Sequence, residues 1–177
     1  MLFWLISDTH WPTRGIYNLR WYIRQFSDVD YLFHMWDFDV WSTYGFFKDY
    51  FWDKLIAVYG NCDDRKIRNE IPEERLLDIN WIKILVFHSH SIYPRWDETR
   101  LLEKALMENV NIVFYGHTHI KKAHYFDLIS NDFRKVNIDG QYFSFSKEEL
   151  SHKIYFINPG SLLNWDFLFF NISLKWC

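Results

Sequence analysis

The amino-acid sequence predicts an α/β fold in which buried strands alternate with helices. Short continuous apolar runs, typical of strands covered on both faces, recur along the chain as far as about residue 115. Segments with apolar residues at helical spacing lie between some of these runs. Five of the runs end in a short polar cluster. The alternation of strand and helix indicates a layered sheet with crossover connections.

The first strand is expected at residues 2–7, a continuous apolar run. A helix is predicted over residues 17–26, where apolar side chains recur at helical spacing and arginines occupy the other face. A second helix is predicted to begin at Asp97, because acidic residues in its first turn suit the helix dipole and Leu101, Leu102 and Ala105 share one face. Further strands are expected at residues 31–35, 55–59, 81–87 and 112–115, with a tight turn at 78–80.

From residue 120 onward the pattern changes to strands joined by turns. Strands are predicted at residues 125–129, 133–138, 141–145 and 153–157, with turns at 130–132 and 139–140. One helical turn is expected at 146–150, a strong turn at 158–161, and a final aromatic strand at 167–176. No linker or repeat divides the chain, so we assign residues 1–177 to a single domain.

The aromatic content is high, with 10 Trp, 11 Tyr and 17 Phe. Two interpretations stand: an aromatic-rich core, or an apolar surface patch that binds a protein partner. The segments 41–52 and 165–176 are the candidates for such a surface. An exposed edge strand at 167–176 would also allow a homo-oligomer to form by strand pairing or by burial of its face.

Charge and cysteine content limit the partners and the compartment. A net charge of −3 gives no positive field, so no nucleic acid partner is expected. The two cysteines, Cys62 and Cys177, cannot form a disulfide framework, which favours a reducing, cytoplasmic location. The apolar start at residues 1–6 is too short for a signal peptide or a membrane span, so no membrane association is expected.

The five polar clusters together offer ligands for two metal ions. They occupy residues 7–10, 34–37, 60–63, 88–90 and 116–119. Side chains at the carboxyl ends of strands in an open α/β sheet share one crevice. Asp8 and His10 are two residues apart, so both can point to one side of an extended loop, and the histidine pairs of the last two clusters repeat this spacing. Carboxylates with imidazoles suit manganese, iron, zinc, nickel or cobalt better than magnesium or calcium.

Each residue, taken alone, also has a plainer interpretation. Asp8 can be a helix cap, and Asn61 can be a turn residue. His34 still lies inside a strand, so a core or supporting role is favoured for it. The histidines without a sequence partner, His124 and His152, are interpreted as structural or surface residues. The plainer interpretation fails for the whole set, because six of the eight histidines lie in or beside the clusters.

Six motifs occur in a fixed order between residue 2 and about residue 161. They are Asp-Thr-His at 8–10, the aspartate at 37, Gly-Asn-Cys-Asp at 60–63, His-Ser-His at 88–90, Gly-His-Thr-His at 116–119 and Asn-Pro-Gly-Ser at 158–161. This ordered set resembles the calcineurin-like metallophosphoesterases, in particular their small single-domain phosphodiesterase branch. Segments 8–14 and 88–94 are similar to the subgroup that contains the vacuolar-sorting subunit of retromer and its microbial relatives. The resemblance implies a four-layer α/β/β/α sandwich with two mixed sheets.

The resemblance also implies two metal subsites that share one carboxylate. The first would comprise Asp8, His10, Asp37 and His119, and the second Asp37, Asn61, His88 and His117. The implied cofactors are two divalent transition-metal ions, with manganese favoured over nickel, iron, zinc or cobalt. The implied reaction is in-line attack on a small or nucleotide-derived phosphodiester by a hydroxide that bridges the metals.

Three positions depart from the pattern of the family. Trp36 stands where the family normally has glycine before the bridging aspartate, and it would strain that turn if the turn requires a positive φ. Ser89 replaces the usual glycine between the paired histidines. Cys62 occupies a position that is histidine in many phosphatases of the wider superfamily, and that histidine helps to protonate the leaving group. Because this chain has cysteine there, monoester hydrolysis is less expected. We assign His90 as the substitute contact to phosphate or leaving group, Asn61 as the other catalytic residue, and Cys62 as a second substrate-binding residue.

Two classes of function follow. The leading hypothesis is a dinuclear-metal phosphodiesterase, which the seven ligand side chains favour. The alternative is a non-catalytic scaffold that binds proteins on the same fold, which Trp36 and the aromatic segments favour. A nuclease fits less well, because the chain is acidic and too short for a separate DNA-binding cap. Residues 129–150 are a predicted insertion, either a hairpin that covers the site or a surface for a partner.

Overall fold

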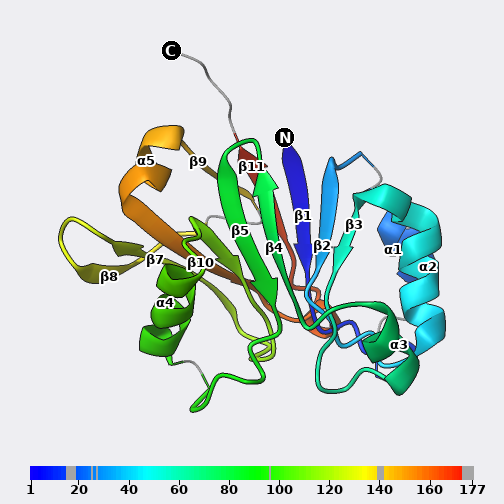
Figure 1. The fold of residues 1–177 in the computed structure, drawn as a ribbon. Helices are drawn as coiled ribbons and strands as arrows, with labels where there is room; N and C mark the ends of the chain where they lie inside the picture. Colours follow the sequence, from blue (N-terminus) through cyan, green and yellow to red (C-terminus); the bar gives the residue numbers. More distant parts are fainter. Residues whose placement is uncertain (15–18, 25, 27, 96, 139–141, 173–177) are drawn as a thin grey trace.

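Two mixed β-sheets face each other in the computed structural model, which describes residues 1–14, 19–24, 26, 28–95, 97–138 and 142–172 (Figure 1). Sheet A has the strand order β3-β2-β1-β11-β9 and sheet B the order β4-β5-β6-β10-β7-β8. The strands of sheet A are β1 (Leu2–Ile6), β2 (Tyr31–His34), β3 (Leu55–Ala57), β9 (Tyr142–Phe145) and β11 (Leu168–Ile172). Those of sheet B are β4 (Glu74–Ile79), β5 (Ile82–Phe87), β6 (Ile112–Phe114), β7 (Lys121–Asp127), β8 (Asp132–Lys135) and β10 (Lys153–Pro159).

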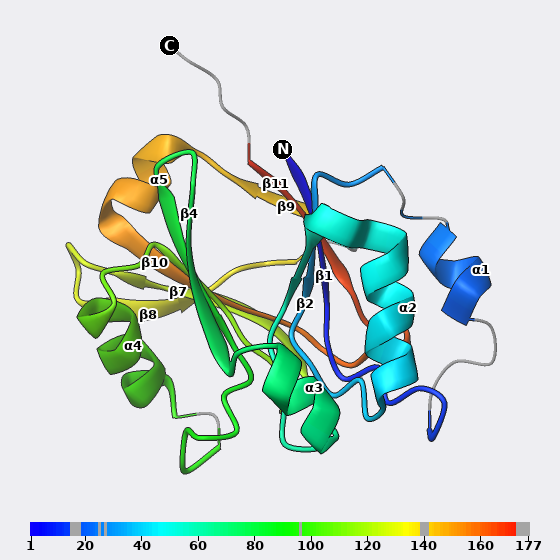
Figure 2. The same cartoon turned by 45° about the vertical axis from the view of Figure 1, so that its right-hand side comes forward.

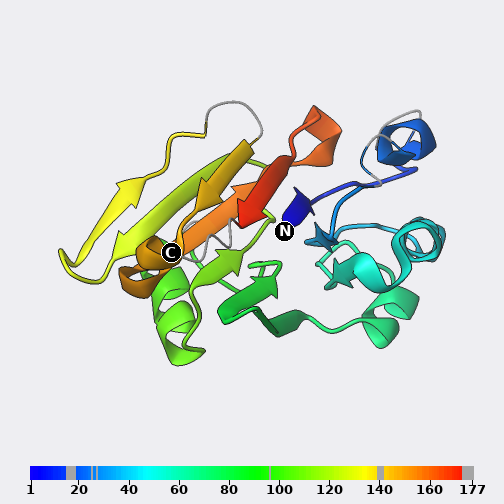
Figure 3. The same ribbon diagram turned by 90° about the horizontal axis from the view of Figure 1, so that it is seen from above.

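Helices cover the outer faces of the two sheets and complete the predicted four-layer α/β/β/α sandwich (Figure 2). The helices are α1 (Leu19–Arg24), α2 (Trp41–Phe51), α3 (Arg65–Glu70), α4 (Glu98–Met107) and α5 (Lys147–His152). The first two pack on sheet A and α4 packs on sheet B, far from them in the view from above (Figure 3). The fold class expected from the sequence is therefore confirmed.

The alternation of side chains along β1 explains why its apolar run is continuous. Phe3 and Leu5 enter the core between the sheets, whereas Trp4 and Ile6 enter the core under α1 and α2. All four side chains have no exposed surface. Successive residues of a strand point to opposite faces, so a strand covered on both sides needs no polar positions.

The helix α4 begins where the sequence predicts. Asp97 is its N-cap, and its Oδ1 accepts a hydrogen bond of 3.1 Å from the amide of Arg100. Leu101 and Ala105 are buried against sheet B. The turn before β5 lies later than predicted, at Asn80 and Trp81, and both of these residues have positive φ.

The segment 41–52 is a helix with a buried aromatic face rather than an aromatic surface. Tyr44, Phe47 and Phe51 lie at i, i+3 and i+7 of α2, the spacing that aligns side chains on one helical face, and all three are buried. Trp52, just beyond the helix, is 75% exposed. The predicted surface is therefore wrong for Phe47 and Phe51, and Phe47→Asp would disrupt the core instead of testing a partner interface.

The final aromatic strand is an interior strand of sheet A. β11 pairs with β1 on one side and with β9 on the other, so it offers no free edge. Leu168, Phe169 and Phe170 are buried. Self-association through an exposed edge or face at 168–172 is therefore contradicted. Residues 173–177 of the predicted strand lie outside the described residues. So do residues 17, 18 and 25 of the first predicted helix, and the predicted turn at 139–140.

Residues 129–150 contribute to both sheets. They include β8, an edge strand of sheet B, and β9, an edge strand of sheet A, followed in the chain by α5. In Figure 1 α5 and β8 lie away from the ends of β1 and β2 that carry the predicted ligands. That the segment is an insertion stays a prediction. Within the described parts of the chain, no helix has the length and apolarity to cross a membrane.

A buried histidine on sheet B makes stability depend on pH. His124 is 2% exposed, stacks on Phe156 at 5.1 Å, and has Glu98 Oε1 3.7 Å from its Nε2, with Lys122 paired to that same carboxylate. Burial lowers its pKa from 6.5 to about 4. The unfolded chain thus binds this proton at a higher pH than the folded chain, so the free energy of unfolding falls as pH drops from 6.5 towards 4.

We expect His124→Phe to remove that pH dependence, because phenylalanine keeps the stacking and cannot be protonated. The histidine contribution is on the order of 2–3 kcal/mol across this range. Urea unfolding of wild type and variant at pH 7 and pH 4.5 measures it. An equal loss of stability in both proteins would contradict the assignment.

Candidate metal centre

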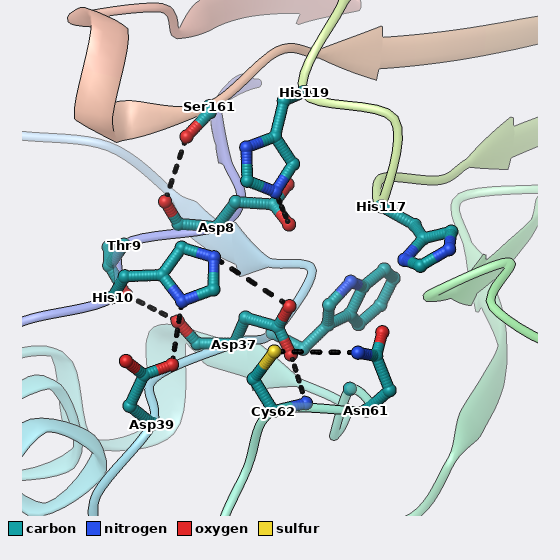
Figure 4. A network of polar contacts seen from close by, with 12 residues as sticks. Asp8, Thr9, His10, Asp37, Asp39, Asn61, Cys62, His117, His119 and Ser161 are labelled. Carbon is teal, nitrogen blue, oxygen red and sulfur yellow. Dashed lines mark hydrogen bonds and ion pairs between the residues drawn. The ribbon is translucent and has the colours of Figure 1, made fainter. Parts of the chain in front are cut away.

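The predicted ligands meet at the carboxyl ends of strands from both sheets (Figure 4). The loops after β1 and β2 carry Asp8, His10 and Asp37, and the loop after β3 carries Asn61. The loops after β5 and β6, in sheet B, bring the remaining histidines to the same place. The site is thus built across the two sheets, which is why the ligands are spread over most of the chain.

The first group gathers around Asp8. Ligand atoms of Asp8, His10 and His119 lie within 4.8 Å of one another. His119 Nε2 is 3.1 Å from Asp8 Oδ1, and His10 Nε2 is 3.8 Å from Asp37 Oδ2. These are the four residues that the family resemblance assigns to one subsite.

The second group converges on a single nitrogen, His88 Nε2. This atom lies 3.4 Å from Asp37 Oδ2, 2.9 Å from Asn61 Oδ1 and 3.2 Å from His117 Nδ1. One ring nitrogen carries at most one proton, so it cannot satisfy three neighbours by hydrogen bonds. Such a gathering of oxygen and nitrogen donors is what a cation between them would require.

Buried donor atoms without partners support the same conclusion for the first group. His10 Nε2 is buried and accepts no hydrogen bond from the described residues, and the buried Asp8 Oδ1 has only the ring of His119 beside it, at 3.1 Å. A buried polar atom left without a partner costs roughly 1–3 kcal/mol. The carboxylate and imidazole set therefore fits divalent transition metals, and the atoms that would bind them are available.

The surroundings of Asp37 and His117 hold these two ligands in their metal-binding forms. Burial raises the pKa of Asp37, but its contacts with the His88 ring and the amide of Cys62 outweigh burial and keep that pKa well below the ordinary range. Burial lowers the pKa of His117 to about 4, so this ring is neutral at pH 7. His119 is the exception: its contact with the Asp8 carboxylate raises its pKa and favours the protonated ring, so a metal ion bound there would have to displace that proton.

The loops that carry the ligands are left-handed rather than extended. Asp8 and His10 have φ of 53° and 45°, and His117 and His119 have φ of 69° and 57°. The expectation of an extended loop at these pairs is wrong. Aspartate and histidine tolerate this conformation better than most residues, and such backbone strain is concentrated at functional sites. Trp36 also has a positive φ, 76°, as the strain argument required.

Two aspartates that the sequence reading left without a role fix the loops. Asp63 accepts hydrogen bonds from the amides of Gly60 at 2.8 Å, Asp39 at 3.0 Å and Asp37 at 3.2 Å. Burial raises its pKa to about 7. Asp39 Oδ1 lies 2.6 Å from His10 Nδ1 and so orients the ring. Asp39 lies two residues after Asp37 and so repeats the i, i+2 spacing of the other clusters, which is the sequence signal that could have identified it.

We expect Asp39→Ala to weaken metal binding in the first group. Without the carboxylate, His10 loses the hydrogen bond that sets its tautomer and orientation, and such losses typically cost about 10–100-fold in metal affinity. Asp39→Asn keeps a hydrogen-bond acceptor, so its metal affinity should lie between that of Asp39→Ala and that of wild type. Calorimetric titration with Mn²⁺ measures both, and unchanged affinity in Asp39→Ala would exclude this role.

The two predicted substrate contacts lie at the rim of the centre. Cys62 donates its backbone amide to Asp37 Oδ1 at 2.9 Å, and burial of its thiol, with the adjacent carboxylate, raises the thiol pKa to about 11. The ring of His90 is tilted by 50° from that of His88, with centroids 5.3 Å apart, and its Nε2 is 3.6 Å from Glu73 Oε1. Burial lowers the pKa of His90. Their roles toward substrate stay predictions.

Residues 1–167 match the calcineurin-like phosphoesterase superfamily domain, and the chain belongs to this family. A relative described as a probable metallophosphoesterase, from Methanocaldococcus jannaschii, is 34% identical over 119 residues, which are 67% of this chain and 59% of the relative. A second probable metallophosphoesterase, from Methanothermobacter thermautotrophicus, is 30% identical over 122 residues, 67% of each chain. The match to the first relative thus spans less than two thirds of its length.

Solved structures share the fold. Vps29 from Entamoeba histolytica, solved with zinc, is 20% identical, has a TM-score of 0.65, and is matched over 99% of this chain and 79% of that chain. Vps29 from Chaetomium thermophilum is 15% identical with a TM-score of 0.67, over 92% and 73%. A structure described as a novel archaeal phosphodiesterase is 23% identical with a TM-score of 0.59, over 93% and 87%.

Proposed function

We propose that this protein is a phosphodiesterase that uses two divalent transition-metal ions to hydrolyse a small or nucleotide-derived diester. The observation that carries the proposal is the convergence of Asp37, Asn61 and His117 on His88 Nε2, beside the group at Asp8. The Asp37 carboxylate lies between the two groups, 3.8 Å from His10 and 3.4 Å from His88, so it is placed to bind a cation on either side.

Bound at these positions, two cations would lower the pKa of a water molecule and neutralise charge on the phosphoryl oxygens. The chain contributes the geometry: Asp63 and Asp39 fix the loops, and the low pKa of Asp37 keeps its carboxylate ionised at neutral pH. His90, at the rim and without hydrogen bonds to its Nδ1 from the described residues, is the side chain we propose to contact the phosphate or leaving group.

The test couples metal content to activity in one sample. Elemental analysis of the purified protein is followed by manganese-dependent hydrolysis of bis-p-nitrophenyl phosphate, with p-nitrophenyl phosphate as the monoester control. We expect two equivalents of metal and hydrolysis of the diester in preference to the monoester. Protein that binds no metal, or that binds two equivalents without turnover, would contradict the proposal.

The second candidate, a non-catalytic scaffold, is favoured by the exposed Trp52 beside α2 and by the Vps29-like fold. A partner bound there would be released by Trp52→Asp and retained by Asp37→Asn. Activity lost in Asp37→Asn with partner binding intact would show that the two functions are separate.

A further inference from the structure

The Trp36 side chain lies directly against a predicted ligand. Its ring meets that of His88 edge to face, with centroids 4.8 Å apart and an interplanar angle of 82°. Trp36 has no exposed surface and belongs to the core between the two sheets. Its φ of 76° is a conformation that a bulky residue adopts at a cost. The chain thus keeps a large ring where glycine would relieve the backbone.

His88 is not oriented in the usual way for a metal-binding histidine. Such a ring commonly donates its second N–H to a carboxylate, a carbonyl or water, as His10 does toward Asp39. The Nδ1 of His88 is buried and has no hydrogen-bond partner among the described residues. The His88 ring also contacts the rings of His117 and His90, with centroids 4.8 and 5.3 Å away, but both of those rings are only half-buried. Packing against the fully buried Trp36 is therefore the core contact that can fix the ring so that Nε2 faces the other ligands.

The indole also lies beside the two loops that supply the remaining ligands of the second group. A Cβ added at Gly60 would lie 2.8 Å from Trp36 Cδ1, and one at Gly116 would lie 3.3 Å from Trp36 Nε1. Gly60 precedes Asn61, and Gly116 precedes His117. Both glycines therefore lie against the indole, which sets how closely these ligand loops approach His88.

We propose that Trp36 is a positioning residue that orients His88 and spaces Asn61 and His117 around it, so that it sets metal affinity in the second group. The inference rests on the proposed dinuclear function. It predicts that loss of the indole weakens binding in the second group while the first group, around Asp8, keeps its affinity.

The experiment measures metal binding in variants that isolate each group. Mn²⁺ and Co²⁺ are titrated by calorimetry into Trp36→Leu made in two backgrounds, His10→Ala, which leaves the second group, and Asn61→Ala, which leaves the first. In the His10→Ala background we expect Trp36→Leu to weaken binding about 10–100-fold, the usual cost of losing support around a ligand. In the Asn61→Ala background we expect no change.

Trp36→Phe serves as the conservative variant, since it keeps a ring against His88 and should restore part of the affinity. Trp4→Leu is the matched control, because Trp4 is equally buried but lies in the core under α1 and α2. It should lose stability without changing metal affinity. Thermal unfolding of each variant confirms that it is folded at the titration temperature.

The outcomes separate the inference from the proposed function. Wild type that binds two equivalents, with unchanged affinity in His10→Ala/Trp36→Leu, overturns the inference alone. Equal weakening in both backgrounds also overturns it, because the effect would then be general. Wild type that binds fewer than two equivalents overturns the proposed dinuclear function itself.

Discussion

Asp37→Asn is expected to abolish diester hydrolysis and to leave the fold intact. Asp37 lies between the two groups, 3.8 Å from His10 Nε2 and 3.4 Å from His88 Nε2, so its charge is needed on both sides. Loss of a supporting residue alone costs about 10–100-fold in metal affinity or activity, so loss of the shared carboxylate should cost more than about 100-fold. The amide oxygen of asparagine can still accept the Cys62 N–H, which preserves the loop.

The measurement is kcat/KM for bis-p-nitrophenyl phosphate together with bound metal. His117→Ala removes a ligand of the second group only and should give a smaller loss of metal with a comparable loss of activity. Asp49→Asn, an exposed aspartate on α2, is the matched control and should behave as wild type. Unchanged turnover in Asp37→Asn and His117→Ala at equal metal content would refute the dinuclear mechanism.

The ligand clusters could be predicted because a buried strand is a continuous apolar run in the sequence. Each apolar run ends where the chain leaves the core, and the polar residues that follow lie at the same edge of the sandwich. The run 2–7 and the pair Asp8 and His10 illustrate this: β1 ends at Ile6 and the two side chains enter the site at once. The distance between clusters along the chain is irrelevant to this reasoning.

Three features were not predicted in the same way. The aromatic residues of α2 suggest a surface when they are counted, and only their helical spacing shows a buried face. Asp63 lies in the motif at 60–63, but its role depends on how two loops fold back so that three of their backbone amides reach its carboxylate, which the motif does not indicate. The left-handed conformation of Asp8 and His10 is imposed by the same tertiary contacts.

Gly60→Ala is expected to damage the site as severely as loss of a ligand. An added Cβ would lie 2.3 Å from Asp37 Oδ1 and 2.8 Å from Trp36 Cδ1, distances at which one of the neighbours must move. Trp36 is fully buried in the core, so the Asp37 carboxylate is the group that has to turn away. It would then leave its hydrogen bond with Cys62 N and its place beside His88.

We therefore expect Gly60→Ala to lose more than about 100-fold in kcat/KM, with weaker metal binding and a loss of about 1–3 kcal/mol in the free energy of unfolding from overpacking. Gly45→Ala is the matched control: a Cβ there meets nothing within 4 Å, and α2 should gain about 0.5–1 kcal/mol. Wild-type metal binding in Gly60→Ala would mean that the Asp37 carboxylate does not need to lie against residue 60. Because the two substitutions are chemically identical, any difference between them must come from the space around each glycine, and at Gly60 that space belongs to the shared ligand.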